Sequence, residues 1–270
     1  SLINIEKLGF SRNNLNRFKN LIERPHGILL VTGPTGSGKS TTLSAALNYL
    51  NSPEKNIITI EDPVEYQLHG INQVQANPQV GLDFASALRS ILRQDPDIVM
   101  VGEIRDEETA RIAIRAALTG HLVLSTLHTN DAVSSITRLV DMGIEPYLVA
   151  STVIGVVAQR LIRRVCGSCK ERHEPSPDEM VLLGEIEEKD RFYRAVGCSK
   201  CNSTGYRGRI AVHEVLVVDD KVKELIVRGA NEPEIKDYCI KSGMTSLVQD
   251  GIYKYKEGIT TYEELVRVLV

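Results

Sequence analysis

The chain has 270 residues, of which 42% are hydrophobic and 25% are charged, with a formal net charge of −3 at pH 7. This length accommodates one large domain with one or two small ones, and the composition is that of a globular protein. The slightly acidic charge, the 5% aromatic content and the lack of tryptophan argue against a nucleic-acid partner. No apolar run in the sequence is long enough to span a membrane.

Residues 1–26 are predicted to form a lead-in or linker with one weak amphipathic helix over 13–24, which ends at Pro25. The first twenty residues are polar and mixed, so we expect no signal peptide. The chain begins with Ser1 and not with methionine, and we therefore expect it to be a fragment of a longer protein.

The stretch from residue 27 to residue 42 is the strongest motif. An apolar strand, 28–31, leads into a loop with the spacing G-x-x-x-x-G-K-S, and a helix is expected over 39–50. Glycines let backbone N–H groups approach phosphate oxygens, and the helix points its positive end at the same place. A plain turn is the alternative. The motif predicts that Lys39 reaches the outer phosphates, that Ser40 binds Mg²⁺, and that nucleotide contacts Gly33, Pro34, Thr35, Gly36, Ser37, Gly38, Lys39, Ser40 and Thr41.

Strands and helices then alternate. Strands are expected over 56–60, 71–75, 98–101 and 121–126, the second as the return strand of a hairpin, and helices over 83–93, 107–119, 132–142 and 146–160. Asp106 is a good N-cap and Gly120 a good C-terminal stop. This alternation predicts an α/β core over residues 27–160, with a mainly parallel sheet covered on both faces.

Acidic and histidine residues occur at strand ends, where open α/β sheets bind ligands. Glu103 follows the strand 98–101 and is the candidate for polarising the attacking water, with Glu61 and Asp62 as further acids of the nucleotide site. Asp62 also suits a turn before proline. His121 and His128 bracket one strand, and either could sense the γ-phosphate or simply be hydrogen-bonded in the fold.

Arg89, Arg93 and Arg105 are candidates to stabilise transition-state charge across a subunit boundary. Ordinary surface ion pairs are the alternative. For each arginine taken alone, a surface ion pair is the better interpretation.

Two cysteine pairs, Cys166/Cys169 and Cys198/Cys201, each have the spacing C-x-x-C, whereas Cys239 stands alone. Four thiolates in two short turns suit a closed, structural, tetrahedral Zn²⁺ site, and reduced thiols in a small core are the alternative. Such a metal would hold together a module, residues 161–208, that has little core of its own. Residues 209–270 are predicted as a helical C-terminal subdomain, with helices over 221–228, 232–242, 247–257 and 261–270.

Together these motifs resemble the secretion ATPase superfamily, and closely the assembly ATPases of type II secretion and type IV pilus systems. The matching segments are the Walker A loop, an acidic box, an atypical Walker B segment, a histidine box, the tetracysteine module and a Gly-Tyr-Arg-Gly-Arg segment, at residues 33–40, 59–65, 93–106, 119–130, 166–201 and 205–209.

The resemblance implies a RecA-like ATPase core and a hexameric motor with ATP, Mg²⁺ and Zn²⁺ as cofactors. It implies a cytoplasmic protein, peripheral to the bacterial inner membrane, that docks on an inner-membrane platform protein and drives assembly of pilin-like subunits. The family also carries an N-terminal domain before this core, which supplies arginine contacts to the nucleotide site. We therefore expect weak hydrolysis and no closed ring from residues 1–270 alone.

Residues 141–146 and 155–160 look more like the type II secretion branch, and a pilus extension motor is the alternative. A non-catalytic alternative is a nucleotide-binding scaffold whose zinc module binds the partner. The sequence shows no signal for the acceptor pocket that a small-molecule kinase needs. Its net charge and low aromatic content argue against a DNA translocase.

Overall fold

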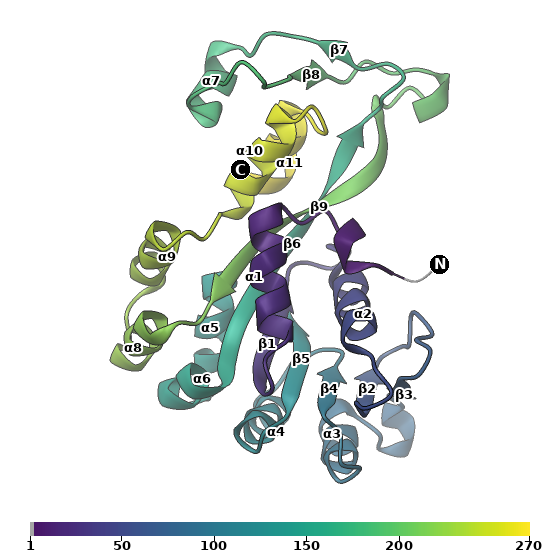
Figure 1. Cartoon of the computed structure of the whole chain (residues 1–270), viewed down its shortest axis with the longest axis vertical. Coiled ribbons are helices and arrows are strands. Elements are labelled where there is room, and N and C mark those ends of the chain that lie inside the picture. Colours follow the sequence, from purple (N-terminus) through teal and green to yellow (C-terminus); the bar gives the residue numbers. More distant parts are fainter. Residues whose placement is uncertain (1–2) are drawn as a thin grey trace.

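The computed structural model describes residues 3–270, so the first two residues of the predicted lead-in lie outside the described part. One seven-stranded sheet, in the order β3-β2-β4-β5-β1-β6-β9, forms the centre of the molecule (Figure 1). Its strands are β1 (Gly27–Thr32), β2 (Ile57–Glu61), β3 (Asn72–Gln75), β4 (Ile98–Val101), β5 (Leu122–Leu127), β6 (Val153–Val165) and β9 (Tyr206–Val217). Every pairing is parallel except that of β6 with β9, which confirms the mainly parallel α/β sheet.

Two apolar cores lie on opposite faces of this sheet, because side chains alternate along each strand. Leu29 and Val31 of β1 pack in one core with the helices that precede and follow that strand, whereas Ile28 and Leu30 pack in the other. The helices are α1 (Arg12–Ile22), α2 (Lys39–Leu50), α3 (Phe84–Leu92), α4 (Glu107–Leu118), α5 (Ala132–Asp141), α6 (Pro146–Thr152), α7 (Pro177–Leu183), α8 (Asp220–Arg228), α9 (Glu232–Lys241), α10 (Leu247–Lys256) and α11 (Tyr262–Leu269). Within residues 3–270, none of the helices has the length and apolar character needed to cross a membrane.

Local capping explains why several predicted helix starts are correct. Asp83, Asp106 and Asp131 each accept a hydrogen bond from the backbone N–H three residues later, which satisfies a donor that the helix leaves unpaired. The helix after the P-loop begins at Lys39, directly after Gly38 in the left-handed conformation with φ 91°.

The predicted hairpin is wrong, because β3 runs parallel to β2. A hairpin requires an antiparallel partner joined by a tight turn. Here residues 62–71 return the chain to the amino-terminal end of β2. Strand β3 then runs beside β2 in the same direction, with Ile58 opposite Asn72 and Glu61 opposite Gln75. The alternating pattern of residues 71–75 predicted a strand but carried no information about its direction.

The predicted helix over 146–160 is wrong beyond its second turn, since α6 ends at Thr152 and β6 begins at Val153. The segment that follows is rich in β-branched residues (Val153, Ile154, Val156 and Val157), which favour strands. It lies between β1 and β9 and pairs with both. A short apolar run fits a buried strand as well as a helix, so pairing with two neighbours decides the outcome.

Strand β9 was not predicted, and together with β6 it forms a long antiparallel ribbon from Gly155/Val217 to Val165/Tyr206. The boundaries expected after residues 160 and 208 therefore fall inside β6 and β9. The far end of the ribbon carries the cysteine module, which contains α7 and the short antiparallel pair β7 (Glu171–Arg172) and β8 (Tyr193–Arg194) (Figure 1).

Candidate functional site

The P-loop lies at the carboxyl end of β1 and leads directly into α2. Gly36 and Gly38 have φ values of 79° and 91°, which residues with a Cβ rarely adopt. The Lys39 ammonium donates to the carbonyl oxygens of Gly33 at 2.8 Å and Pro34 at 3.0 Å, so its charge lies inside the loop. Burial lowers the pKa of Lys39, and the nearby Glu103 carboxylate opposes that effect. A cation at this position is well placed to meet phosphate oxygens.

A cavity of about 500 Å³ opens beside the loop, a volume in the range of small-molecule sites. Its walls come from the P-loop, from the carboxyl ends of β2, β4 and β5 with the segments that follow them, and from β6 and β9. Its lining residues include Lys39, Ser40, Asp62, Glu65, Glu103, Arg105, His128 and Arg209.

Glu103 lies at the centre of this arrangement. One carboxylate oxygen is 2.8 Å from Nε2 of His128, and the other accepts a hydrogen bond from Nε of Arg105 at 2.7 Å. The backbone that carries it is fixed, because Gly102 N–H donates to Ile60 O at 2.8 Å and Thr126 Oγ1 donates to Gly102 O at 2.7 Å. The side chain is 18% exposed, so it is oriented by protein contacts and still open to the cavity.

Gly102 explains why the strand does not end in an ordinary acidic residue at this position. A Cβ there would lie 3.3 Å from Ile60 O and 3.4 Å from the Phe84 ring, which is tighter than normal packing. The acid is therefore displaced by one residue, to Glu103, which meets His128 at the end of the adjacent strand β5.

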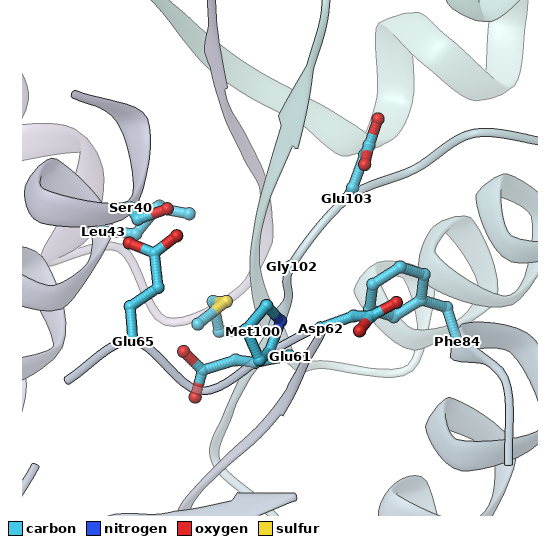
Figure 2. A pocket seen from close by; sticks show the side chains of 10 residues that line it. Ser40, Leu43, Glu61, Asp62, Glu65, Phe84, Met100, Gly102 and Glu103 are labelled. Carbon is cyan, nitrogen blue, oxygen red and sulfur yellow. The ribbon is translucent and has the colours of Figure 1, made fainter. Parts of the chain in front are cut away.

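Glu61 lies in the same region, but its carboxylate is already hydrogen-bonded to side chains of β2 and β3. Its carboxylate accepts hydrogen bonds from Thr59 Oγ1 at 2.8 Å and Gln73 Nε2 at 3.0 Å, and the residue is buried. It lines a smaller hollow of about 70 Å³ together with Ser40, Asp62, Glu65 and Glu103. Figure 2 shows the Glu65 carboxylate pointing toward Ser40. Sequence reasoning did not select Glu65, although it lies in the acidic segment 59–65.

The two histidines separate in the structure. His128 follows β5 and reaches Glu103, whereas His121 precedes β5 at the opposite edge of the sheet. Nδ1 of His121 is 2.9 Å from Ala116 O, and its carbonyl accepts from Gly27 N–H at the start of β1. The structure therefore does not bring His121 to the cavity, and strand direction alone could have separated the pair.

The arginine candidates also divide. Arg89 forms an exposed ion pair with Glu108 at 2.6 Å, and Arg93 contacts Ser90 Oγ at 3.4 Å, away from the cavity. Arg105 lines the cavity and holds Glu103. Arg209 of β9 lines it too, and it was missed because β9 itself was not predicted.

The four paired cysteines converge at the far end of the β6–β9 ribbon, with all their sulfur atoms within 4.8 Å of one another. The Sγ–Sγ distances are 4.0 Å for Cys166–Cys198, 3.9 Å for Cys169–Cys201 and 3.8 Å for Cys198–Cys201. Ligands at about 2.3 Å from a tetrahedral zinc are about 3.8 Å apart, so the donor set fits that ion. The fifth cysteine, Cys239, is buried in the helical region, where burial raises its pKa to about 11.

Comparison with known proteins gives matches along nearly the whole chain. Residues 1–267 match the family described as Type II/IV secretion system protein. The type IV pilus assembly ATPase PilB of Thermus thermophilus is 55% identical over 265 residues, covering 97% of this chain and 30% of PilB. The type II secretion system ATPase E of Vibrio cholerae is 54% identical over 267 residues, covering 98% of this chain and 53% of that protein.

Solved structures show the same fold. The pilus retraction motor PilT with bound ADP matches with a TM-score of 0.73 at 32% identity, over 98% of this chain and 66% of PilT. The Legionella pneumophila ATPase DotB shares the fold with a TM-score of 0.71 at 24% identity, over 98% of this chain and 64% of DotB. The chain spans 53% of the length of ATPase E and 30% of the length of PilB, so it corresponds to about half of the first relative and less than a third of the second.

Proposed function

The chain belongs to the Type II/IV secretion system protein family, and we propose that it is the ATP-hydrolysing core of a hexameric motor that powers type II protein secretion. The motor would act at the cytoplasmic face of the bacterial inner membrane, on a platform protein, and would drive the assembly of pilin-like subunits. The observation that supports ATP hydrolysis best is Glu103, held by His128 and Arg105 at a cavity that the P-loop lines.

The residues of the cavity divide the chemistry among them. The P-loop amides and the Lys39 ammonium bind the phosphates, and Ser40 with Glu65 or Asp62 nearby would hold Mg²⁺. Bound Mg²⁺ would neutralise negative charge on the phosphate oxygens. Glu103 orients and polarises the attacking water, while the contacts of His128 and Arg105 keep its carboxylate in one orientation. Glu61, already bonded to Thr59 and Gln73, acts by fixing the end of β2.

Transition-state charge would be met by arginines. Arg209 and Arg105 lie at the cavity of their own chain. Arg89 and Arg93 lie away from it on α3 and its C-terminal end, so any catalytic contact that they make would be with nucleotide in a neighbouring subunit.

We also propose that Zn²⁺ is held by Cys166, Cys169, Cys198 and Cys201, on the sulfur geometry given above. Four sulfur ligands close the coordination sphere, so the metal would be structural and would stabilise the module at residues 161–208. The division into a core over 27–160, this module and a C-terminal part over 209–270 remains a proposal, with β6 and β9 running across both boundaries.

Pilus extension is the second candidate function, because a pilus assembly ATPase is as similar to this chain as a type II secretion ATPase is. Loss of the gene in its own bacterium distinguishes the two. Loss of secreted enzymes with intact surface pili supports type II secretion, and the reverse phenotype supports pilus assembly.

The test of hydrolysis compares the wild type with Lys39→Ala and Glu103→Gln in a magnesium-dependent ATPase assay. We expect Lys39→Ala to lose nucleotide binding and turnover, and Glu103→Gln to bind nucleotide with kcat lowered at least 100-fold. Equal activity in all three proteins would contradict the proposal. Binding without turnover in the wild type would favour the scaffold alternative.

A further inference from the structure

One buried side chain, Gln159 of β6, holds the P-loop from behind. Its Nε2 donates to Ser37 O at 2.7 Å, and its Oε1 accepts from Thr42 Oγ1 at 2.7 Å. Gln159 is 2% exposed and Thr42 is fully buried, so these hydrogen bonds are shielded from water. Both ends of the amide are therefore engaged, one with the loop and the other with the first turn of α2.

The hydrogen bond to Ser37 O also orients a donor of the loop. The C=O of one residue and the N–H of the next belong to one planar trans peptide and point in opposite directions. Fixing Ser37 O against Gln159 therefore turns the Gly38 N–H away from β6, toward the cavity that Gly36, Gly38 and Lys39 line. This is the arrangement that phosphate binding by backbone amides requires.

The loop lies so close to β6 that its glycines are needed for packing as well. A Cβ at Gly38 would lie 2.6 Å from Gln159 Nε2, and a Cβ at Gly33 would lie 2.5 Å from Gln159 O. A side chain at Gly33 would clash with the backbone of β6, and one at Gly38 would displace the Gln159 amide from its hydrogen bonds. Gly33 and Gly38, two glycines of the phosphate-binding pattern, are therefore also needed for the close contact of the loop with Gln159.

We propose that Gln159 is a positioning residue for nucleotide binding, which holds the P-loop amides in the phosphate-binding arrangement. This inference rests on the proposed ATPase function.

The test measures the Kd of a fluorescent ATP analogue with Mg²⁺, together with KM and kcat, on the full chain. Gln159→Leu keeps the approximate volume but removes both hydrogen bonds and leaves Ser37 O and the Thr42 hydroxyl without a partner. We expect about a tenfold increase in Kd and KM, with kcat changed less than threefold because Glu103 and His128 keep their contacts. A loss of stability alone would not produce this separation of KM from kcat.

Two threonine variants complete the design. Thr42→Val removes only the hydrogen bond to Oε1, so we expect about a threefold increase in Kd, and no further increase when it is added to Gln159→Leu. Thr152→Val is the matched control, because it removes a buried hydroxyl that bonds to Leu148 O, near the other end of β6. Its Kd should equal that of the wild type.

A Kd for Gln159→Leu within threefold of the wild type overturns the inference, and so does a kcat that falls as much as KM rises. If Gln159→Leu does not fold, Thr42→Val decides alone: a threefold weaker Kd supports the inference, and an unchanged Kd overturns it. Lys39→Ala separates this outcome from failure of the ATPase proposal, since unchanged hydrolysis in that variant refutes the proposed function whatever Gln159 does.

Discussion

Acidification should destabilise the protein through His213, a fully buried histidine in β9. Among residues 3–270, neither of its ring nitrogens has a hydrogen-bond partner, and its ring stacks on Phe10 with 3.7 Å between centroids. Burial lowers the pKa of His213 well below 6.5, and the ammonium of Lys254 on α10 adds to the effect. Asp250 contacts the backbone of this histidine and not its ring, since its Oδ2 accepts from the His213 backbone N–H and from Lys254.

The lowered pKa of His213 determines how the free energy of unfolding changes with pH. The folded state keeps the imidazole neutral, whereas the unfolded chain takes up a proton as the pH falls through 6.5. The stabilisation is therefore present above pH 6.5 and is lost below it, by up to about 1.4 kcal/mol per pH unit while the folded imidazole stays neutral. Between pH 6 and pH 5 this single group should reduce the free energy of unfolding by about 1.2 kcal/mol.

Urea unfolding of wild type and His213→Phe at pH 7.5, 6.0 and 5.0 measures this effect. Phenylalanine keeps the stack on Phe10 and does not titrate, so other acid-labile groups cancel in the difference between the two proteins. The variant should gain about 1.2 kcal/mol relative to wild type between pH 6 and pH 5. Parallel stability curves for the two proteins would refute the reasoning, since they would mean that the histidine is protonated equally in the folded and unfolded states.

Two other predictions concern the cysteine module and the helix contacts of β9. Metal analysis of the purified protein should find one zinc per chain, and Cys198→Ser should lose the metal and unfold at a lower temperature; less than about half a zinc in the wild type contradicts the site. Burial raises the pKa of Glu214, whose carboxylate accepts from Ala132 N–H at 2.9 Å and Leu247 N–H at 3.3 Å. Its stabilisation is therefore lost as the pH rises above 4.5, and Glu214→Gln should gain stability relative to wild type from pH 4.5 upward in urea titrations, whereas a constant difference would count against this explanation.

Sequence patterns predicted the parts of the site that depend on local geometry. The P-loop spacing places Lys39 and Ser40 at the start of the helix that follows the loop after a buried strand, because glycine conformation and a helix start are properties of neighbouring residues. Glu103 was predicted because the short apolar run of β4 defines the carboxyl end of that strand, just before this residue. Two C-x-x-C pairs predicted the convergence of four sulfur atoms, although 28 residues separate Cys169 from the next pair.

Residues that reach the site through strand pairing were not predicted. Gln159 and Arg209 lie on β6 and β9, which the sequence presented as the end of a helix and as the start of a helical subdomain. Glu65 lay within the acidic segment, but only the path of the chain after β2 points it toward Ser40 (Figure 2). His121 and His128 looked equivalent until the direction of β5 separated them by the length of a strand.

The sequence by itself determined a parallel α/β core, a phosphate-binding loop, the acid that follows β4 and a four-cysteine cluster, because each is indicated by short local patterns of residues. Only the tertiary structure decided that residues 153–165 extend as a strand beside β1, that β9 pairs with them, and that Gln159 meets the back of the P-loop. An apolar, β-branched run can be buried in either conformation. Hydrogen bonding to two neighbouring strands, one of them some fifty residues later in the chain, is what selects the strand.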